Sequence, residues 1–125
     1  MDYLLDTNAV IYLQQGKLLE PLPVGRYGIS VITEMELRSF VGLADEESLW
    51  LKRFIGAVVS IGLELNIKET AIRLRRDHRL KLPDAIIVAS ALAYDTRLVT
   101  HDQRLVRLPG LRLYSLVLRK SEGDE

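Results

Sequence analysis

Short apolar runs alternate with longer amphipathic stretches along the whole chain, as expected for strands that alternate with helices. The apolar runs predict strands at residues 2–5, 27–31, 58–65, 97–100 and 111–116. The stretches between them predict helices at residues 7–15, 33–40, 45–57 and 85–93, and another that begins after Asn66. Strands that alternate with helices imply crossover connections. We therefore predict an α/β fold with a mostly parallel central sheet of about five strands and helices on both faces.

Several local signals support the predicted helices. Three consecutive acids at residues 45–47 favour a helix N-terminus, and Leu49, Phe54 and Ile55 would form the apolar stripe of that helix, with Trp50 beside it. Pro83 suits a first helical position. The following stretch, AIIVASALA, is apolar nearly all round, which predicts a helix that is buried on most sides.

Four acidic residues closely follow apolar runs: Asp6, Glu36, Asp84 and Asp102. A strand that ends on a carboxylate carries it to the carboxyl edge of the sheet, where open α/β folds bind ligands. Carboxylates that converge there repel one another, so they stay ionised only when a cation joins them. Hard carboxylate oxygens select Mg²⁺ or Mn²⁺. The pattern therefore predicts a metal-dependent site for phosphoryl transfer.

Two of these acids also fit a structural role at a helix N-terminus. Asp6 suits the N-cap of the helix that follows it, although Thr7 or Asn8 could serve equally well. Glu36 fits a capping box with Thr33, in which its side chain reaches back to the Thr33 amide. For both residues the structural and the catalytic interpretations stay open.

The other two acids have structural interpretations as well. Asp84 can complement the dipole of the apolar helix that it opens, but a charge at the head of a buried helix is costly unless it is paired or bound to metal. Asp102 can be a turn residue with Thr100 as its partner. The two histidines, His78 and His101, lack the i, i+4 spacing of metal ligands, so we expect surface or hydrogen-bonding roles for them.

Composition places the 125 residues in one ordinary globular domain, expected to span residues 1–120 with a disordered tail at 121–125. The chain has no cysteine, which excludes disulfides and thiolate zinc sites. It has neither an apolar run long enough to cross a membrane nor a signal-peptide pattern, so we expect a cytoplasmic protein.

The net charge is zero, but its distribution is uneven. Residues 73–120 carry 11 basic and 4 acidic side chains, and this half could bind an anionic polymer such as RNA. A solvated helix face at residues 73–79 would explain the arginines there equally well.

Four segments carry a resemblance to a known family. In chain order, LLDTN, ISVITEMELRS, LPDAIIVASAL and LVTHDQRL resemble the successive motifs of a PIN domain and, more narrowly, of a VapC-type toxin from a type II toxin–antitoxin system. The resemblance implies an α/β/α sandwich and a Mg²⁺- or Mn²⁺-dependent ribonuclease. It places the family's acidic quartet, which binds metal and catalyses hydrolysis, on Asp6, Glu36, Asp84 and Asp102. The polar residues that would surround this quartet are Thr7, Asn8, Ser30 and Thr100. His101 departs from the asparagine that is frequent before the last aspartate.

The resemblance further implies a small cognate antitoxin and a homodimer. An excess of large apolar residues could supply a groove for an amphipathic antitoxin segment, with an antitoxin arginine entering the acidic site. These residues are Leu13, Leu18, Leu19, Leu22, Trp50 and Leu51.

Two other functions stay open on the sequence. A metal-dependent phosphatase could use Asp6 as its nucleophile, although the lysine that usually accompanies such a nucleophile has only Lys81 as a weak candidate. A degenerate, non-catalytic module that binds RNA or protein is the other alternative, and the presence of all four acids argues against it.

Overall fold

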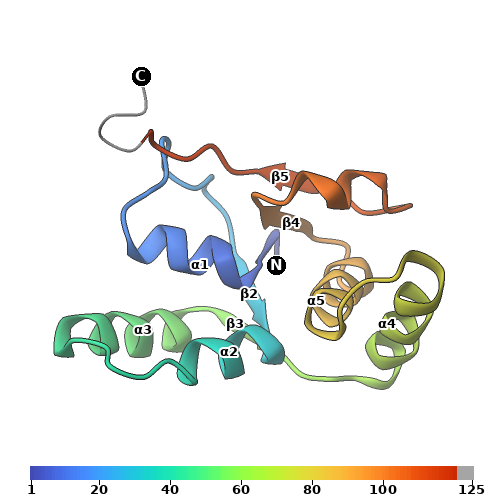
Figure 1. Cartoon of the computed structure of the whole chain (residues 1–125), viewed down its shortest axis with the longest axis horizontal. Coiled ribbons are helices and arrows are strands. Elements are labelled where there is room, and N and C mark those ends of the chain that lie inside the picture. Colours follow the sequence, from blue (N-terminus) through green and yellow to red (C-terminus); the bar gives the residue numbers. More distant parts are fainter. Residues whose placement is uncertain (121–125) are drawn as a thin grey trace.

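A five-stranded parallel sheet runs through the middle of the protein in the computed structural model, which describes residues 1–120 (Figure 1). The elements in chain order are β1 (Tyr3–Leu5), α1 (Thr7–Gln14), β2 (Tyr27–Ser30), α2 (Val31–Arg38), α3 (Asp45–Ala57), β3 (Val59–Ile61), α4 (Leu65–His78), α5 (Leu82–Ala93), β4 (Arg97–Thr100), the 3₁₀ helix η1 (Gln103–Arg107) and β5 (Leu113–Ser115). The predicted α/β fold is confirmed, and every strand pair in these residues is parallel.

The strand order β3-β2-β1-β4-β5 places β1 at the centre of the sheet. The chain builds β1, β2 and β3 outward in one direction and then returns to add β4 on the other side of β1. The order of the strands therefore reverses between β1 and β4. In parallel sheets the carboxyl ends of the strands at such a reversal flank a crevice that binds ligands.

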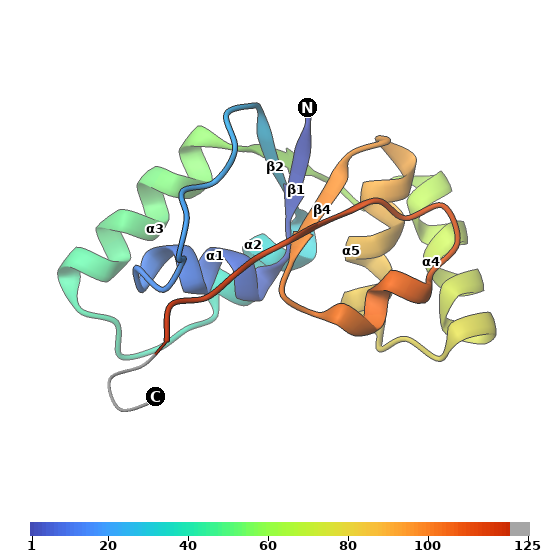
Figure 2. The same cartoon turned by 90° about the horizontal axis from the view of Figure 1, so that it is seen from above.

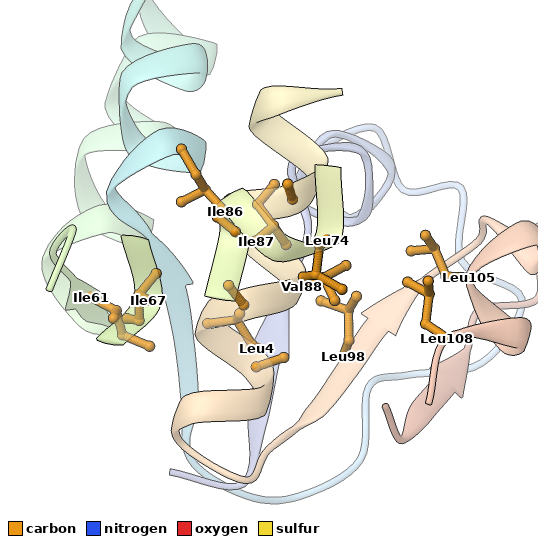
Figure 3. Packing of buried hydrophobic residues seen from close by; sticks show 14 residues of the cluster. Leu4, Ile61, Ile67, Leu74, Ile86, Ile87, Val88, Leu98, Leu105 and Leu108 are labelled. Carbon is orange, nitrogen blue, oxygen red and sulfur yellow. The ribbon is translucent and has the colours of Figure 1, made fainter. Parts of the chain in front are cut away.

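Helices cover both faces of the sheet, with α1, α2 and α3 on one side and α4 and α5 on the other (Figures 1 and 2). Alternate residues of each strand face opposite layers. Leu4 and Leu98 pair in register and pack with α4 and α5, as Figure 3 shows, whereas Leu5 and Val99 pack with α1 and α2. This two-residue alternation gives the protein two cores, one on each face of the sheet.

The helix α5 is buried as its sequence predicts. Every residue from Ala85 to Ala91 is buried, and the Ser90 hydroxyl donates a hydrogen bond to the Ile86 carbonyl at 2.7 Å. Packing against α4 and the sheet sets the position of α5 from Ala85 onward. Asp84 lies in the first turn of α5, directly before this buried stretch.

Two helices begin two residues earlier than predicted. The helix α2 begins at Val31 with Ser30 as its N-cap, so Thr33 lies buried inside the helix and cannot form a capping box with Glu36. The helix α4 begins at Leu65 and not after Asn66, so Asn66 lies inside the helix and cannot be its N-cap. Glu64 holds the N-cap position, and its carboxylate accepts hydrogen bonds from the Tyr94 hydroxyl, one of them at 2.8 Å.

The apolar positions near α1 and α3 also differ in part from the prediction. Leu49, expected in the stripe of α3, is 47% exposed, whereas Leu51 is in the core. Of the six residues expected to form a groove, Leu19 is exposed, while Leu13, Leu18, Leu22 and Trp50 are partly buried.

The remaining boundaries agree closely, although the third strand is shorter than predicted, at Val59–Ile61. No helix within residues 1–120 has both the length and the apolar character needed to span a bilayer. The tail expected to be disordered, residues 121–125, lies outside the described residues.

Candidate active site

The carboxyl ends of β1 and β4 meet at the reversal of strand order and bring Asp6 and Asp102 to the same edge of the sheet. Asp6 directly follows β1, and its amide donates to the Val99 carbonyl of β4 at 3.2 Å. Asp102 lies two residues beyond the end of β4. The N-terminus of α5 brings Asp84, and α2 brings Glu36, to the same region.

Asp6 combines a structural contact with an unfavourable charge. Its Oδ1 accepts a hydrogen bond from the Ala9 amide at 2.7 Å, which caps α1 as the structural interpretation predicts. Burial raises the pKa of the Asp6 carboxyl, and the charges of Asp84 and Asp102 raise it further, whereas Thr100 and the Ala9 amide partly offset the rise. The capping role accounts for the position of Asp6 but not for an acid placed near two others.

Glu36 reaches across to the start of α1. The Thr7 hydroxyl donates to Glu36 Oε1 at 2.7 Å, and Thr33 Oγ1 lies 3.1 Å from Thr7 Oγ1. Glu34, two residues earlier in α2, does not join this contact and pairs with Arg38 at 3.1 Å. Glu36 is therefore positioned by a tertiary contact with Thr7 rather than by a cap of its own helix.

Asp84 lies between the other acids. Burial raises the pKa of the Asp84 carboxyl, the charges of Asp102 and Glu36 raise it as well, and Arg104 and Lys81 oppose the rise. The charges of the four acids therefore lie close enough to interact with one another.

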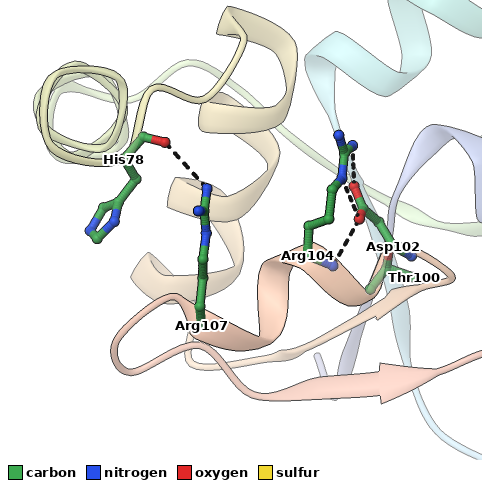
Figure 4. Close-up of polar contacts among 5 residues, drawn as sticks. All are labelled: His78, Thr100, Asp102, Arg104 and Arg107. Atoms are coloured by element: carbon green, nitrogen blue, oxygen red, sulfur yellow. Dashed lines mark hydrogen bonds and ion pairs between the residues drawn. The ribbon is translucent and has the colours of Figure 1, made fainter.

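Asp102 is held by Arg104, a residue that no sequence motif marked as part of the site. Arg104 Nε donates to Asp102 Oδ1 at 2.9 Å and Arg104 Nη2 to Oδ2 at 2.7 Å (Figure 4). These bonds lower the pKa of Asp102. The predicted turn is also present: the Asp102 amide donates to Thr100 Oγ1 at 3.0 Å, and Oδ1 caps η1 through the Arg104 amide. An Asp-x-Arg spacing is too common to have indicated this ion pair.

Two adjoining pockets contain the four acids and share Asp84. One, of about 270 Å³, contains Asp6, Glu36 and Asp84 together with Thr7 and Asn8. The other, of about 170 Å³, contains Asp84 and Asp102. Within residues 1–120 no group of three or more histidine, aspartate or glutamate side chains is close enough to hold one metal ion as the side chains stand.

The donor chemistry of the first pocket nevertheless suits a hard divalent cation. In the described part of the chain, Asp6, Glu36 and Asp84 form no ion pair with a basic side chain. Asp6 and Asp84 are partly buried, and burial of carboxylates without a cationic partner is unfavourable. Carboxylate, hydroxyl and amide oxygens are the ligands that Mg²⁺ and Mn²⁺ prefer, so the residues fit the predicted metal.

The other predicted polar residues differ in their placement. Thr7 and Asn8 line the acid-containing pocket, and Thr100 contacts the Asp102 amide. Ser30 is buried and caps α2, accepting a hydrogen bond from the Ile32 amide at 3.1 Å, so its observed role is structural. His101 packs edge-on against Tyr12, and His78 uses its backbone carbonyl to accept from Arg107.

Comparison with known proteins identifies the family and the fold. The PIN domain family profile matches residues 3–111. A toxin–antitoxin complex from Klebsiella pneumoniae contains a chain that is 28% identical, with a TM-score of 0.70, and the match covers 91% of this chain and 99% of that one. No relative was found among curated protein sequences.

Two further solved structures share the fold. The VapBC complex of Salmonella typhimurium, solved bound to DNA, matches at 23% identity with a TM-score of 0.77, covering 92% of this chain and 98% of that one. VapBC2 of Rickettsia felis, bound to a DNA fragment from its promoter, matches at 21% identity and the same TM-score, covering 94% of this chain and 100% of that one. The fold of the described residues is thus a known architecture.

Proposed function

Because this chain belongs to the PIN domain family, we propose that it is a metal-dependent ribonuclease that acts as the cytoplasmic toxin of a toxin–antitoxin pair. The observation that carries the proposal is the placement of four acids around two adjoining pockets where the strand order reverses. Three of these acids have no basic partner in the described residues, which is the condition that a divalent cation would relieve.

Asp6, Glu36, Asp84 and Asp102 are the residues that would hold Mg²⁺ or Mn²⁺. A bound divalent cation supplies a water of lowered pKa and neutralises charge on the phosphate oxygens. The Thr7 hydroxyl orients the Glu36 carboxylate through its 2.7 Å hydrogen bond. Asn8 is exposed and lines the pocket, so its side-chain amide can donate a hydrogen bond to the RNA backbone. The buried helix α5 positions Asp84 in its first turn.

The phosphatase alternative loses support from the position of its lysine. Lys81 lines the pocket of Asp84 and Asp102, whereas the proposed nucleophile Asp6 lines the other pocket. A lysine that assists an aspartyl nucleophile must contact the same phosphoryl group. The ribonuclease therefore remains the function that the geometry supports best.

The direct test is cleavage of single-stranded RNA by the purified chain with Mg²⁺, with Mn²⁺ and with EDTA. We expect cleavage with either metal and none with EDTA. Asp6→Asn should abolish cleavage, whereas Asp77→Asn, the same chemical change at an exposed position of α4 outside both pockets, should leave it unchanged. Cleavage by Asp6→Asn at the normal rate would refute the assignment of the site.

The antitoxin that we propose has a suitable groove between α2 and α3. This groove, of about 440 Å³, is lined by Leu37, Arg38, Phe40, Leu43, Ser48, Leu51, Lys52 and Ile55. Phe40 also lines the pocket that contains Asp6, Glu36 and Asp84, so the groove lies beside that pocket. An amphipathic antitoxin segment in the groove could extend a cationic side chain to the acids and displace the metal.

Of the residues expected from the sequence to form this groove, only Leu51 lines it. Leu43→Asp should weaken inhibition by the antitoxin encoded by the neighbouring reading frame without reducing RNA cleavage. Val24→Asp, at a fully exposed position outside the groove, is the matched control. Equal inhibition of both variants would exclude the groove as the antitoxin site.

A further inference from the structure

Basic side chains outnumber acidic ones in the second pocket of the site. It contains Asp84, Asp102, two leucines and four basic side chains, which are Arg79, Lys81, Arg104 and Arg107. Arg104 is neutralised by Asp102. The other three basic residues form no ion pair with any carboxylate in the part of the chain that the structure describes. An excess of positive charge therefore surrounds a small hollow directly beside Asp84.

The local structure directs these cations toward one place. Residues three apart lie on the same face of a 3₁₀ helix, so Arg104 and Arg107 extend from the same side of η1 (Figure 4). Leu105 and Leu108 are buried in the core, and their burial fixes how this segment is rotated about its axis. Arg107 Nη2 reaches the His78 carbonyl at 3.4 Å, at the end of α4.

Arg79 reaches the pocket from a strained backbone. It ends α4 in the left-handed conformation, at φ 57° and ψ 33°, which favours glycine or asparagine. Stabilisation of the α4 dipole by a basic residue would explain a cation here. It does not explain why Lys81, beyond the helix, and Arg107, from a different element, line the same hollow.

We infer that Arg79, Lys81 and Arg107 bind a backbone phosphate of the RNA strand, next to the phosphodiester that is cleaved beside Asp84. This inference rests on the proposed ribonuclease function and names a binding site for the substrate on one side of the acids. The pocket volume of about 170 Å³ suits a phosphate group and is well below that of a typical pocket for a whole small molecule. Guanidinium groups match phosphate oxygens in a two-point geometry.

On this inference the two sides of the cleaved bond contact different surfaces. One side of the cleaved bond lies over the cationic pocket, and the other side lies over the pocket that contains Asn8 and Phe40. Contacts to phosphate carry no base information, so the cationic pocket contributes affinity and register rather than sequence preference.

The test is the binding of a short, labelled, single-stranded RNA in EDTA, over a series of salt concentrations, with the integrity of the RNA checked on a gel. Arg79→Gly, Lys81→Gln and Arg107→Gln should each weaken binding by about tenfold. The three changes combined should reduce the slope of log K against log salt by roughly 0.7, the contribution of one phosphate, and each single change should reduce it by part of this. Arg97→Gln removes the same charge from an exposed position at the opposite end of β4. This control should leave both the RNA affinity and the salt slope unchanged.

Arg79→Gly keeps the test independent of folding, because glycine relieves the left-handed backbone. Pocket variants that bind RNA as tightly as Arg97→Gln, with the same salt slope, overturn the inference. Loss of antitoxin binding with unchanged RNA affinity also overturns it and would assign these cations to an acidic protein segment. Because the assay contains no metal and requires no cleavage, its result is separate from that of the ribonuclease test.

Discussion

Replacing Asp6 by asparagine and by alanine separates its capping contact from its charge. Asparagine keeps an oxygen that can accept from the Ala9 amide, whereas alanine removes the 2.7 Å hydrogen bond. Both changes remove the negative charge that burial and two neighbouring acids disfavour. The two variants therefore share the electrostatic gain and differ in the cap alone.

The size of that difference follows from known N-caps. Asparagine and aspartate are equally good caps, and alanine costs about 1 kcal/mol relative to them. For a chain of this length about 1 kcal/mol corresponds to roughly 4 °C in Tm. In EDTA at neutral pH, we expect Asp6→Asn to be more stable than the wild type, and Asp6→Ala to melt roughly 4 °C below Asp6→Asn.

The dependence on pH provides an internal check. The folded protein has the higher Asp6 pKa, so it binds more protons than the unfolded chain between the ordinary value of 3.8 and the raised value. Stability of the wild type therefore falls as pH rises through this window and stays at the lower level above it. The advantage of Asp6→Asn should accordingly be full at neutral pH and shrink as the pH is lowered toward 3.8.

Thermal or urea denaturation in EDTA and in Mg²⁺ measures these effects. Metal stabilises only a protein that binds it, by about 1.4 kcal/mol at ten times the Kd, so Mg²⁺ should reduce or reverse the advantage of Asp6→Asn over the wild type. Equal stability of the asparagine and alanine variants would refute the capping argument. A destabilised Asp6→Asn in EDTA would refute the argument from buried charge.

Four further outcomes are expected. Glu36→Gln should change the free energy of unfolding by no more than about 0.5 kcal/mol, because the side chain is exposed. The same change should lower RNA cleavage by orders of magnitude, and full activity would leave Glu36 a structural role only. Calorimetric Mn²⁺ affinity should fall as pH decreases through the raised pKa values of Asp6 and Asp84, since protons compete with the metal, and a flat profile would contradict this. Arg104→Gln should raise Mn²⁺ affinity because it frees Asp102 from its ion pair. Arg112→Gln breaks the ion pair with Asp95, outside the site, and should leave Mn²⁺ affinity unchanged. Light scattering should report a dimer of about twice 14.2 kDa, and a monomer at micromolar concentration would exclude it.

The sequence by itself determined the architecture. Alternating apolar runs predicted the strands, and the unbroken apolar character of residues 85–93 predicted the buried helix that carries Asp84. These features depend on local periodicity and on burial, which the spacing of apolar residues along the sequence indicates directly. The polar residues that interrupt them, Asp6 and Asp102, were predicted to lie at the carboxyl edge of the sheet, and they do.

Only the tertiary structure decided what each acid contacts. Glu36 looked like half of a capping box with Thr33, but a helix that starts at Val31 buries Thr33 and leaves Glu36 to accept from Thr7, 29 residues away. Helix starts depend on small differences between adjacent capping residues, here Ser30 and Thr33, which sequence patterns resolve poorly.

The cationic pocket shows the same division. An arginine at the end of α4, a lysine before α5 and an arginine of η1 are unremarkable as separate surface charges, and the sequence also allowed a solvated helix face. They share one hollow because the chain returns from α5 through β4 to the place where α4 ends. Periodicity records which side of an element faces the core, but proximity between elements is set by how their buried faces pack. The neighbours of a charged side chain therefore emerge only in the folded protein.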